Sequence, residues 1–308
     1  MAQNDGPPLG KFLASSEKAT RDKAVKHLVE FLSNPTGRIL SDDLELAKLW
    51  KGIFYCYWMS DKPPVQQALA TELADILLKI PDPSSSLLFL KGFWQTIVRE
   101  WPGIDRLRMD KYYMLIRRFV NASFVLLIKN GWSPSLCEEH NDILRSAGSP
   151  LCPSDPRVPL GLSYHLSEIW LIELNKACTT VPAQKPVPLA LVLAPFLTLA
   201  AKTPNKITNQ QIQANLIDPL LSTLSLPQEP DEPPLLKRLK MGSTWDDMSQ
   251  LLANCCLSPL DKPLDRSRLR KGVLEYIFEV ASREDSKDSN RRKLYAIYKT
   301  NIDEDDDP

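Results

Sequence analysis

Cys137 and His140 lie three residues apart in a segment whose spacing predicts a helix, so their side chains would share one helical face. A thiolate beside an imidazole is a nucleophile for covalent catalysis. No glycine-rich loop that could stabilise an oxyanion accompanies this pair. The sequence also has no phosphate-binding loop, no dinucleotide-binding glycines and no His-Glu-x-x-His motif. We therefore predict that the protein is not an enzyme and that it has no small-molecule substrate.

Metal binding is the second chemistry to consider, because the chain has six cysteines and three histidines. No two cysteines form a Cys-x-x-Cys pair, and the histidines lack the spacing of zinc ligands. The acidic residues 303–307 could collect divalent cations, but an acidic terminal segment is typically solvated and disordered. We expect no metal, no cofactor and free thiols in a reducing compartment. The residues concerned are Cys56, Cys137, Cys152, Cys178, Cys255, Cys256, His27, His140 and His165.

Polar residues on a long helix predicted from Ile104 to Asn130 form two sets. In the first, Arg106, Asp110, Arg117 and Asn121 share one face. The interpretation that we favour is a salt-bridged stripe, with Arg106 and Asp110 paired four residues apart. The alternative is a polar surface for a partner protein or for an RNA backbone.

The second set, Arg108, Lys111 and Arg118, borders the apolar face of the same helix. Long basic side chains can lie along apolar surface while their charged groups reach solvent. Together with Arg99, these residues form a candidate site for RNA phosphates, which carry most of the affinity for nucleic acids. The chain has 38 basic and 38 acidic residues, and this balance argues against coating nucleic acid by charge alone.

Two short basic clusters lie further along the chain. Lys237, Arg238 and Lys240 follow a proline-rich stretch and form a candidate RNA contact or nuclear-import signal. The run from Arg291 to Lys293 is open to the same two interpretations.

Helices must position all of these residues, because apolar side chains recur at intervals of three and four along almost the whole chain. Ser41 is the predicted N-cap of a helix with Asp42 and Asp43 in its first turn, Pro63-Pro64 should end that helix, and Gly131 should form a C-cap. No segment alternates convincingly with the period of a strand. Helices are predicted near residues 24–32, 42–57, 65–80, 87–101, 104–130, 134–146, 162–177, 189–201, 208–224, 264–281 and 291–298.

Helices of roughly 15 residues joined by short breaks predict an all-α fold, a degenerate stack of antiparallel helix pairs of the HEAT or armadillo type. The 308 residues are 43% hydrophobic and 25% charged, which is ordinary for a globular protein with a sizeable core. The longest apolar run, residues 187–197, is too short to span a bilayer, and no membrane partner is expected. We predict a flexible N-terminus (1–8), one helical-repeat domain (9–300) with proline-rich loops near 147–161 and 227–234, and an acidic disordered tail (301–308).

Four of the seven tryptophans, Trp50, Trp58, Trp94 and Trp101, lie in two aromatic-rich segments. Aromatic rings at helical spacing usually fill a core, because each ring removes much apolar surface from water. We expect these four rings to be largely buried between neighbouring helices. Lys, Arg and Asp alternate with them, although a plain core would not require such residues.

The amino-acid sequences of these segments resemble those of one family, the eukaryotic nucleolar ribosomal RNA-processing protein 1 family. The similarity is strongest at Thr20-Arg21-Asp22-Lys23-Ala24-Val25 and in residues 50–63 and 93–119, and it covers roughly residues 10–280. These matches are long and rich in composition, so chance is a poor explanation for them.

The resemblance implies a helical, non-catalytic protein of the nucleolus and nucleus that travels with early precursors of the large (60S) ribosomal subunit. It implies a requirement for the protein in processing of pre-rRNA, and partners that include a β-propeller protein and a Brix-domain protein. Pre-rRNA itself is a further candidate partner. We therefore predict a scaffold for assembly of pre-60S particles. The alternative is a generic helical-repeat adaptor between proteins outside ribosome biogenesis.

Overall fold

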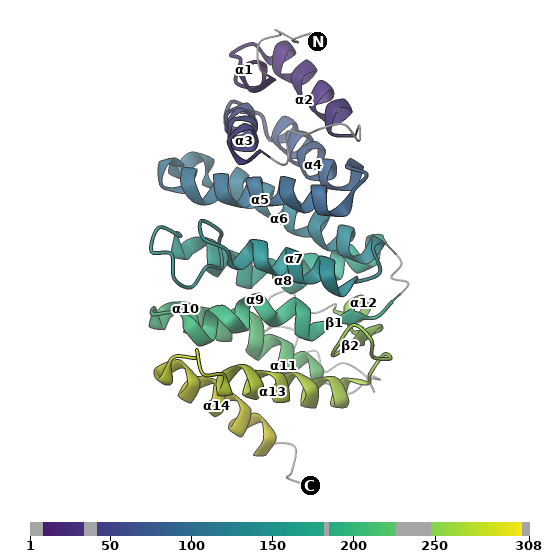
Figure 1. Ribbon diagram of the computed structural model, residues 1–308, viewed down its shortest axis with the longest axis vertical. Helices are drawn as coiled ribbons and strands as arrows, with labels where there is room; N and C mark the ends of the chain where they lie inside the picture. The colour runs from purple at the N-terminus through teal and green to yellow at the C-terminus, as the bar shows by residue number, and fades with distance from the viewer. Residues whose placement is uncertain (1–8, 34–41, 182–184, 226–247, 304–308) are drawn as a thin grey trace, which may run out of the picture. The chain divides into compact units, whose positions relative to one another are not determined.

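The computed structural model describes residues 9–33, 42–181, 185–225 and 248–303, and Figure 1 shows its course. The predicted N-terminal segment 1–8, the loop 227–234 and residues 304–308 of the predicted tail lie outside the described residues. The described residues form helices that pack in pairs, apart from one pair of two-residue strands, so the all-α prediction is confirmed. The chain divides into two compact units, residues 1–126 and 127–308, which are described separately.

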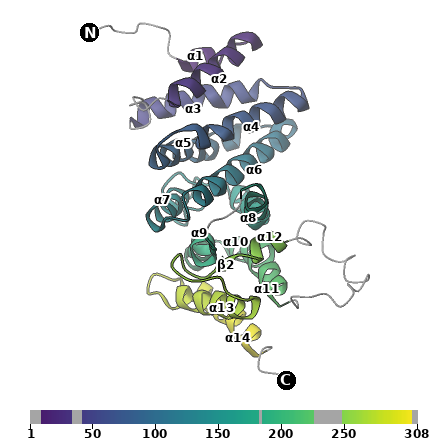
Figure 2. The same cartoon turned by 90° about the vertical axis from the view of Figure 1, so that its right-hand side faces the viewer.

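The first unit begins with two helices that pack on each other, and α1 also packs on α3 (Figure 2). Further contacts join α2 to α4, and α5 to both α3 and α4. A 3-10 turn (Trp101–Gly103) leads from α5 into the long helix α6. The helices are α1 (Leu9–Leu13), α2 (Lys18–Leu32), α3 (Asp43–Trp58), α4 (Pro63–Lys79), α5 (Pro83–Glu100) and α6 (Arg106–Lys129), of which the last three residues belong to the second unit.

The ends of α3 differ from the prediction by a few residues. Asp42, rather than Ser41, is the N-cap, because its carboxylate accepts hydrogen bonds from the backbone N–H groups of Leu44 and Glu45. The helix ends at Trp58, before the proline pair, and Pro63 instead begins α4. Proline suits a first helical position because the backbone N–H that it lacks would have no partner there.

Aromatic rings fill the core of the first unit. The ring centroids of Trp50 and Phe89 are 4.5 Å apart, and those of Phe93 and Phe119 are 3.8 Å apart in a stacked arrangement. The Trp50 indole lies over Gly92, where a Cβ atom would come within 2.3 Å of the ring. Burial of Trp50, Trp94 and Trp101 is confirmed, whereas Trp58 is half-buried because its ring lies at the surface beneath Arg108.

In the second unit the helix predictions are confirmed within a few residues, except at the last helix. That helix is predicted over 291–298, but α14 is twice as long and extends into residues 301–303 of the predicted tail. Gly131 has a φ of 60°, as its predicted C-cap role requires. The helices are α7 (Pro134–Arg145), α8 (Leu160–Thr180), α9 (Leu189–Lys202), α10 (Lys206–Ile212), a π-helical turn (Gln213–Ile217), α11 (Asp218–Leu224), α12 (Ser249–Leu252), α13 (Arg266–Ser282) and α14 (Asp288–Asp303).

A short strand pair, which the sequence analysis did not predict, joins two distant segments of the second unit. The strands β1 (Val187–Pro188) and β2 (Cys255–Cys256) pair in parallel, with Val187 opposite Cys255. The backbone N–H of Val187 donates to the carbonyl of Asn254 at 2.9 Å. This contact fixes the segment before α13 against the start of α9.

Two further observations bear on the nature of the chain. Among the described residues, no helix is both long enough and apolar enough to cross a membrane. All six cysteines are free thiols, and five of them are buried, with Cys178 partly exposed.

Candidate partner-binding surface

Lys111 is the predicted phosphate contact that the structure places furthest from solvent. Its side chain is buried, and its ammonium group donates to the carbonyl oxygens of Tyr57, Trp58 and Ser60 at 3.1, 2.7 and 2.9 Å. These carbonyls lie at the C-terminal end of α3, where a cation is favourable. Lys111 therefore joins α6 to the end of α3, and its ammonium group is held by these carbonyls rather than offered to a phosphate.

Arg108 lies on the surface with its guanidinium carbon 4.7 Å from the centre of the Trp58 ring. It also forms an ion pair with Asp105, one turn earlier on the chain. Stacking on an aromatic ring and pairing with a carboxylate both restrict the guanidinium, which remains about one-third exposed. Tyr55 is exposed on α3, three residues before Trp58. The result is a small aromatic and basic surface with an ordered arginine.

The remaining predicted residues of the first unit are accessible, but they do not form a single patch. Arg99 is exposed and pairs with Glu100 at 2.8 Å, Arg106 and Arg118 are exposed, and Arg117 is partly exposed. At about 100° per residue, Arg106 and Arg117 share a face of α6, whereas Arg108 lies on nearly the opposite face.

The residues of the predicted salt-bridged stripe lie on the solvent side of α6. Arg106 and Asp110 are both exposed, and Asn121 is partly exposed, so the polar face of α6 is available to solvent or to a partner. Of the two short basic clusters further along the chain, the one formed by Lys237, Arg238 and Lys240 lies outside the described residues.

Leu107 is an exposed residue that the sequence analysis missed, and its side chain is 93% exposed between two arginines. Its spacing gave no signal, because Leu107 follows the buried Ile104 by three residues and precedes the buried Leu115 by eight, as a core position would. An apolar side chain beside exposed guanidinium groups is suited to contact with a macromolecule rather than to covalent chemistry.

The possible nucleophilic pair in the second unit is buried. Both Cys137 and His140 are only 2% exposed, and the His140 ring lies 6.2 Å from the centre of the Trp170 ring. Burial raises the pKa of the Cys137 thiol to about 12 and lowers the pKa of His140 to about 4. Both shifts favour the neutral groups over the charged pair that nucleophilic catalysis requires. These two residues therefore serve the packing of α7.

The burial of His140 predicts a pH dependence of stability. Because its pKa is about 4 in the folded protein and near 6.5 when exposed, the folded state binds fewer protons between these values. The contribution of His140 to the free energy of unfolding is then fully present above about pH 6.5. It falls as the pH decreases, by about 3 kcal/mol at pH 4. Urea unfolding at pH 7 and pH 4 measures this loss. The variant His140→Leu should lose correspondingly less over the same interval, and an identical loss in both proteins would contradict the prediction.

Within the residues that the structure describes, no group of three or more His, Cys, Asp or Glu side chains is arranged to hold a metal ion. What the first unit does present is several separate accessible guanidinium groups, of which Arg108 lies over an aromatic ring. Such groups can contact a protein or the phosphates and bases of RNA.

Comparisons with known proteins agree on one family. A family model described as "Nucleolar protein, Nop52" matches residues 4–298. The chain is 38% identical over 233 residues to the human protein "Ribosomal RNA processing protein 1 homolog B", and 32% identical over 321 residues to the human homolog A. A Caenorhabditis elegans protein of the same description is 26% identical over 287 residues.

The matches cover most of this chain but differing shares of its relatives. They span 75%, 94% and 93% of this chain for the human homolog B, the human homolog A and the nematode protein. They span 30%, 68% and 65% of those relatives. The described helices therefore correspond to a part of each relative.

Proposed function

Because the chain belongs to the Nop52 family of nucleolar proteins, whose relatives are named for ribosomal RNA processing, we propose that it is a non-catalytic scaffold for assembly of the large ribosomal subunit. In this proposal the protein holds assembly factors in place on the precursor particle. Its loss stalls the cleavage of pre-rRNA, although the protein itself cuts no RNA.

The match over residues 4–298 is the observation that carries this proposal, because it includes almost every described helix of both units. We propose that these helices form one functional domain over residues 9–300, with a degenerate HEAT- or armadillo-like arrangement. Helices that pack in pairs expose long surfaces, and such surfaces suit binding over extended areas. The buried state of Cys137 and His140 supports a role in binding rather than in turnover.

The proposed partners follow from the same family relationship. They are protein factors of the pre-60S particle, including a β-propeller protein and a Brix-domain protein, with pre-rRNA as an additional partner. The exposed Arg106 and Arg118 of α6 are the best-placed residues for a phosphate contact, since both charged groups are accessible.

Sedimentation of nucleolar extracts tests the proposal. The tagged protein should migrate with precursors of the large subunit, and its depletion should cause unprocessed precursor RNA to accumulate. An adaptor outside ribosome biogenesis would stay at the top of the gradient and leave precursor RNA unchanged.

A charge-reversed variant tests the α6 surface in the same gradients. The double substitution Arg106→Glu and Arg118→Glu should release the protein from particles, and the release should grow as salt increases. The matched control reverses Lys26 and Lys79, which are exposed on α2 and α4. Equal behaviour of both variants would mean that the α6 surface has no specific part in binding, while sedimentation of the wild-type protein would still test the scaffold.

A further inference from the structure

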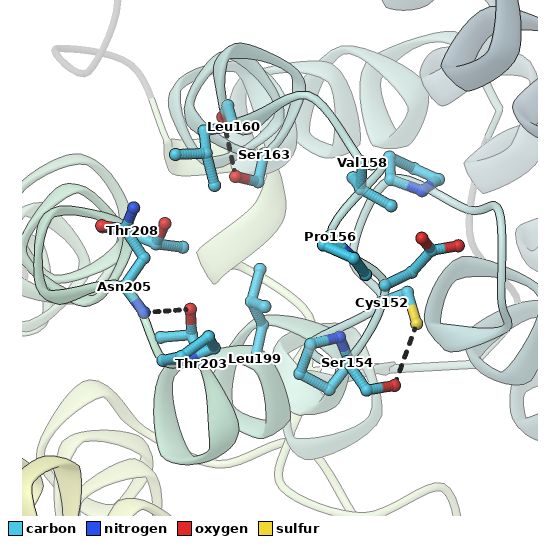
Figure 3. A pocket seen from close by; sticks show the side chains of 14 residues that line it. Cys152, Ser154, Pro156, Val158, Leu160, Ser163, Leu199, Thr203, Asn205 and Thr208 are labelled. Atoms are coloured by element: carbon cyan, nitrogen blue, oxygen red, sulfur yellow. Dashed lines mark hydrogen bonds between the residues drawn. The ribbon is translucent and has the colours of Figure 1, made fainter.

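A cavity of about 300 Å³ lies in the second unit, where the proline-rich connection between α7 and α8 meets three helix ends (Figure 3). The connection forms one wall, the start of α8 forms another, and the end of α9 and the start of α10 close the remaining side. In Figure 3, Leu199 lies at its base, between Pro156 and Val158 on one side and Thr208 on the other.

The walls of the cavity are chiefly apolar. Four proline rings line it, and proline has no backbone N–H to donate to a ligand. Leu160, Val158 and Leu199 add aliphatic surface, and Leu160 is 44% exposed at the start of α8. The four prolines are Pro150, Pro153, Pro156 and Pro204.

Several polar groups of the lining are already used inside the protein. The Thr203 hydroxyl accepts from the backbone N–H of Asn205 at 3.2 Å, and the Ser163 hydroxyl donates to the carbonyl of Leu160 at 2.9 Å. The Asn205 side-chain oxygen accepts from the backbone N–H groups of Ile207 and Thr208 as the N-cap of α10. These groups shape the cavity without requiring a polar ligand.

The lining offers no positive charge. Asp155 is the one acidic residue among those that line the cavity, and none of them is Lys, Arg or His. The Asp155 side chain is only 5% exposed, and it is neutralised by two hydrogen bonds from the Arg157 guanidinium and one from the Gly148 N–H. These contacts hold the pKa of this carboxyl well below its usual range. A phosphate group would find no cation among these walls, and an ammonium group would find a carboxylate that is already paired.

We propose that this cavity receives one uncharged, apolar side chain of a partner protein. The neutral lining selects against charged ligands, and the volume is at the small end of ligand pockets, which suits one large side chain. An anchor of this kind lets a few residues contribute much of the affinity of an interface. The inference rests on the proposed function in one respect, because it takes the partners to be proteins.

Methyl NMR spectroscopy of the full chain tests the inference with defined compounds. The compounds are N-acetyl-tryptophanamide, N-acetyl-leucinamide, N-acetyl-lysinamide and adenosine monophosphate, and the methyl groups of Val158, Leu160 and Leu199 serve as reporters. The two apolar amides should shift these signals in a saturable way. The lysine amide and the nucleotide should bind at least about tenfold more weakly, since the cavity has no group to pair with their charges.

Two leucines provide a matched pair of variants. Leu160→Asp places a charge at the cavity and should weaken binding of the apolar amides about tenfold. Leu260→Asp changes a leucine that is 93% exposed in the same unit and does not line the cavity, so it should leave binding unchanged. Ser154→Trp, on the exposed part of the connection, gives a second test, because the new ring should fill the cavity and reduce binding of the apolar amides. The rest of the spectrum reports whether the fold is intact.

The outcomes separate this inference from the proposed function. Absence of saturable shifts in the wild-type protein, tighter binding of the nucleotide, or equal losses in the Leu160 and Leu260 variants would each overturn it. Wild-type sedimentation with large-subunit precursors is measured independently, so the scaffold proposal can stand when the cavity proposal fails.

Discussion

Replacing Trp50 by alanine is expected to lower the free energy of unfolding by about 3–5 kcal/mol, as truncation of a fully buried aromatic side chain does. The ring is 2% exposed and contacts Phe89, Phe93 and Phe119, so its loss leaves a cavity between three helices. Its indole N–H also donates to the carbonyl of Phe89 at 3.0 Å. Since the total stability of a domain is about 5–15 kcal/mol, this variant should be near the limit of folding.

Urea unfolding followed by circular dichroism measures the effect without relying on tryptophan emission. Trp58→Ala is the matched control, because it removes the same ring from a half-buried position on the same helix. The control should lose less stability than the Trp50 variant, because the Trp58 ring removes less apolar area from water. A smaller loss at Trp50 than at Trp58 would show that the aromatic core does not stabilise the fold as described.

Substitution of Lys111 by methionine should destabilise the protein by about 2–3 kcal/mol, although it replaces a buried charge with an apolar chain of similar length. Two effects oppose each other. Burial lowers the pKa of Lys111 to about 8, so removal of the ammonium relieves a cost of desolvation. The substitution also takes away the donor to three carbonyls at the end of α3, and hydrogen bonds from a charged donor are the stronger kind.

The carbonyl of Trp58 determines that the Lys111→Met substitution lowers stability rather than raising it. The Tyr57 carbonyl also accepts from the Ser60 hydroxyl at 2.6 Å, and the Ser60 carbonyl also accepts from Gln66 at 3.0 Å. The bond from Lys111 to Trp58 is the shortest of its three, at 2.7 Å, and a helix-end carbonyl without a donor is costly when buried. Thermal and urea unfolding at pH 7 measure the loss. Unchanged stability together with weaker RNA association would restore Lys111 as a phosphate contact.

Most helices of this fold could be predicted from the sequence because they combine a regular apolar stripe with a clear break. The short helices α1 and α12 were not predicted, since five and four residues are too few to show a helical period. Pro63, Pro83 and Pro134 each begin a helix, and a proline is unmistakable in a sequence. The N-cap of α3 could not be fixed to one residue, because Ser41 and Asp42 are both good caps and lie side by side. The strand pair was missed for a different reason, since two residues are too few to show a period of two.

The candidate site was harder to predict, because its properties depend on residues far apart in sequence. Periodicity placed Arg108 and Lys111 beside the apolar face of α6, which is correct. It could not show that Lys111 reaches carbonyls 51–54 residues away, or that Arg108 lies over Trp58. The cavity was likewise out of reach, because it forms only where one connection and three helix ends meet. Individual elements follow from local patterns, whereas the environment of each charged group follows from tertiary packing.

The buried thiols give each unit its own chemical reporter. Alkylation by iodoacetamide requires a thiolate that the reagent can reach, and burial raises the pKa of Cys56 to about 11 and that of Cys137 to about 12. Either residue can therefore react only when its surroundings open. Because Cys56 belongs to the first unit and Cys137 to the second, labelling rates read by peptide mass spectrometry would give two separate opening free energies from one native sample. The protein thus carries, without any engineering, the means to establish whether its two units open together or independently.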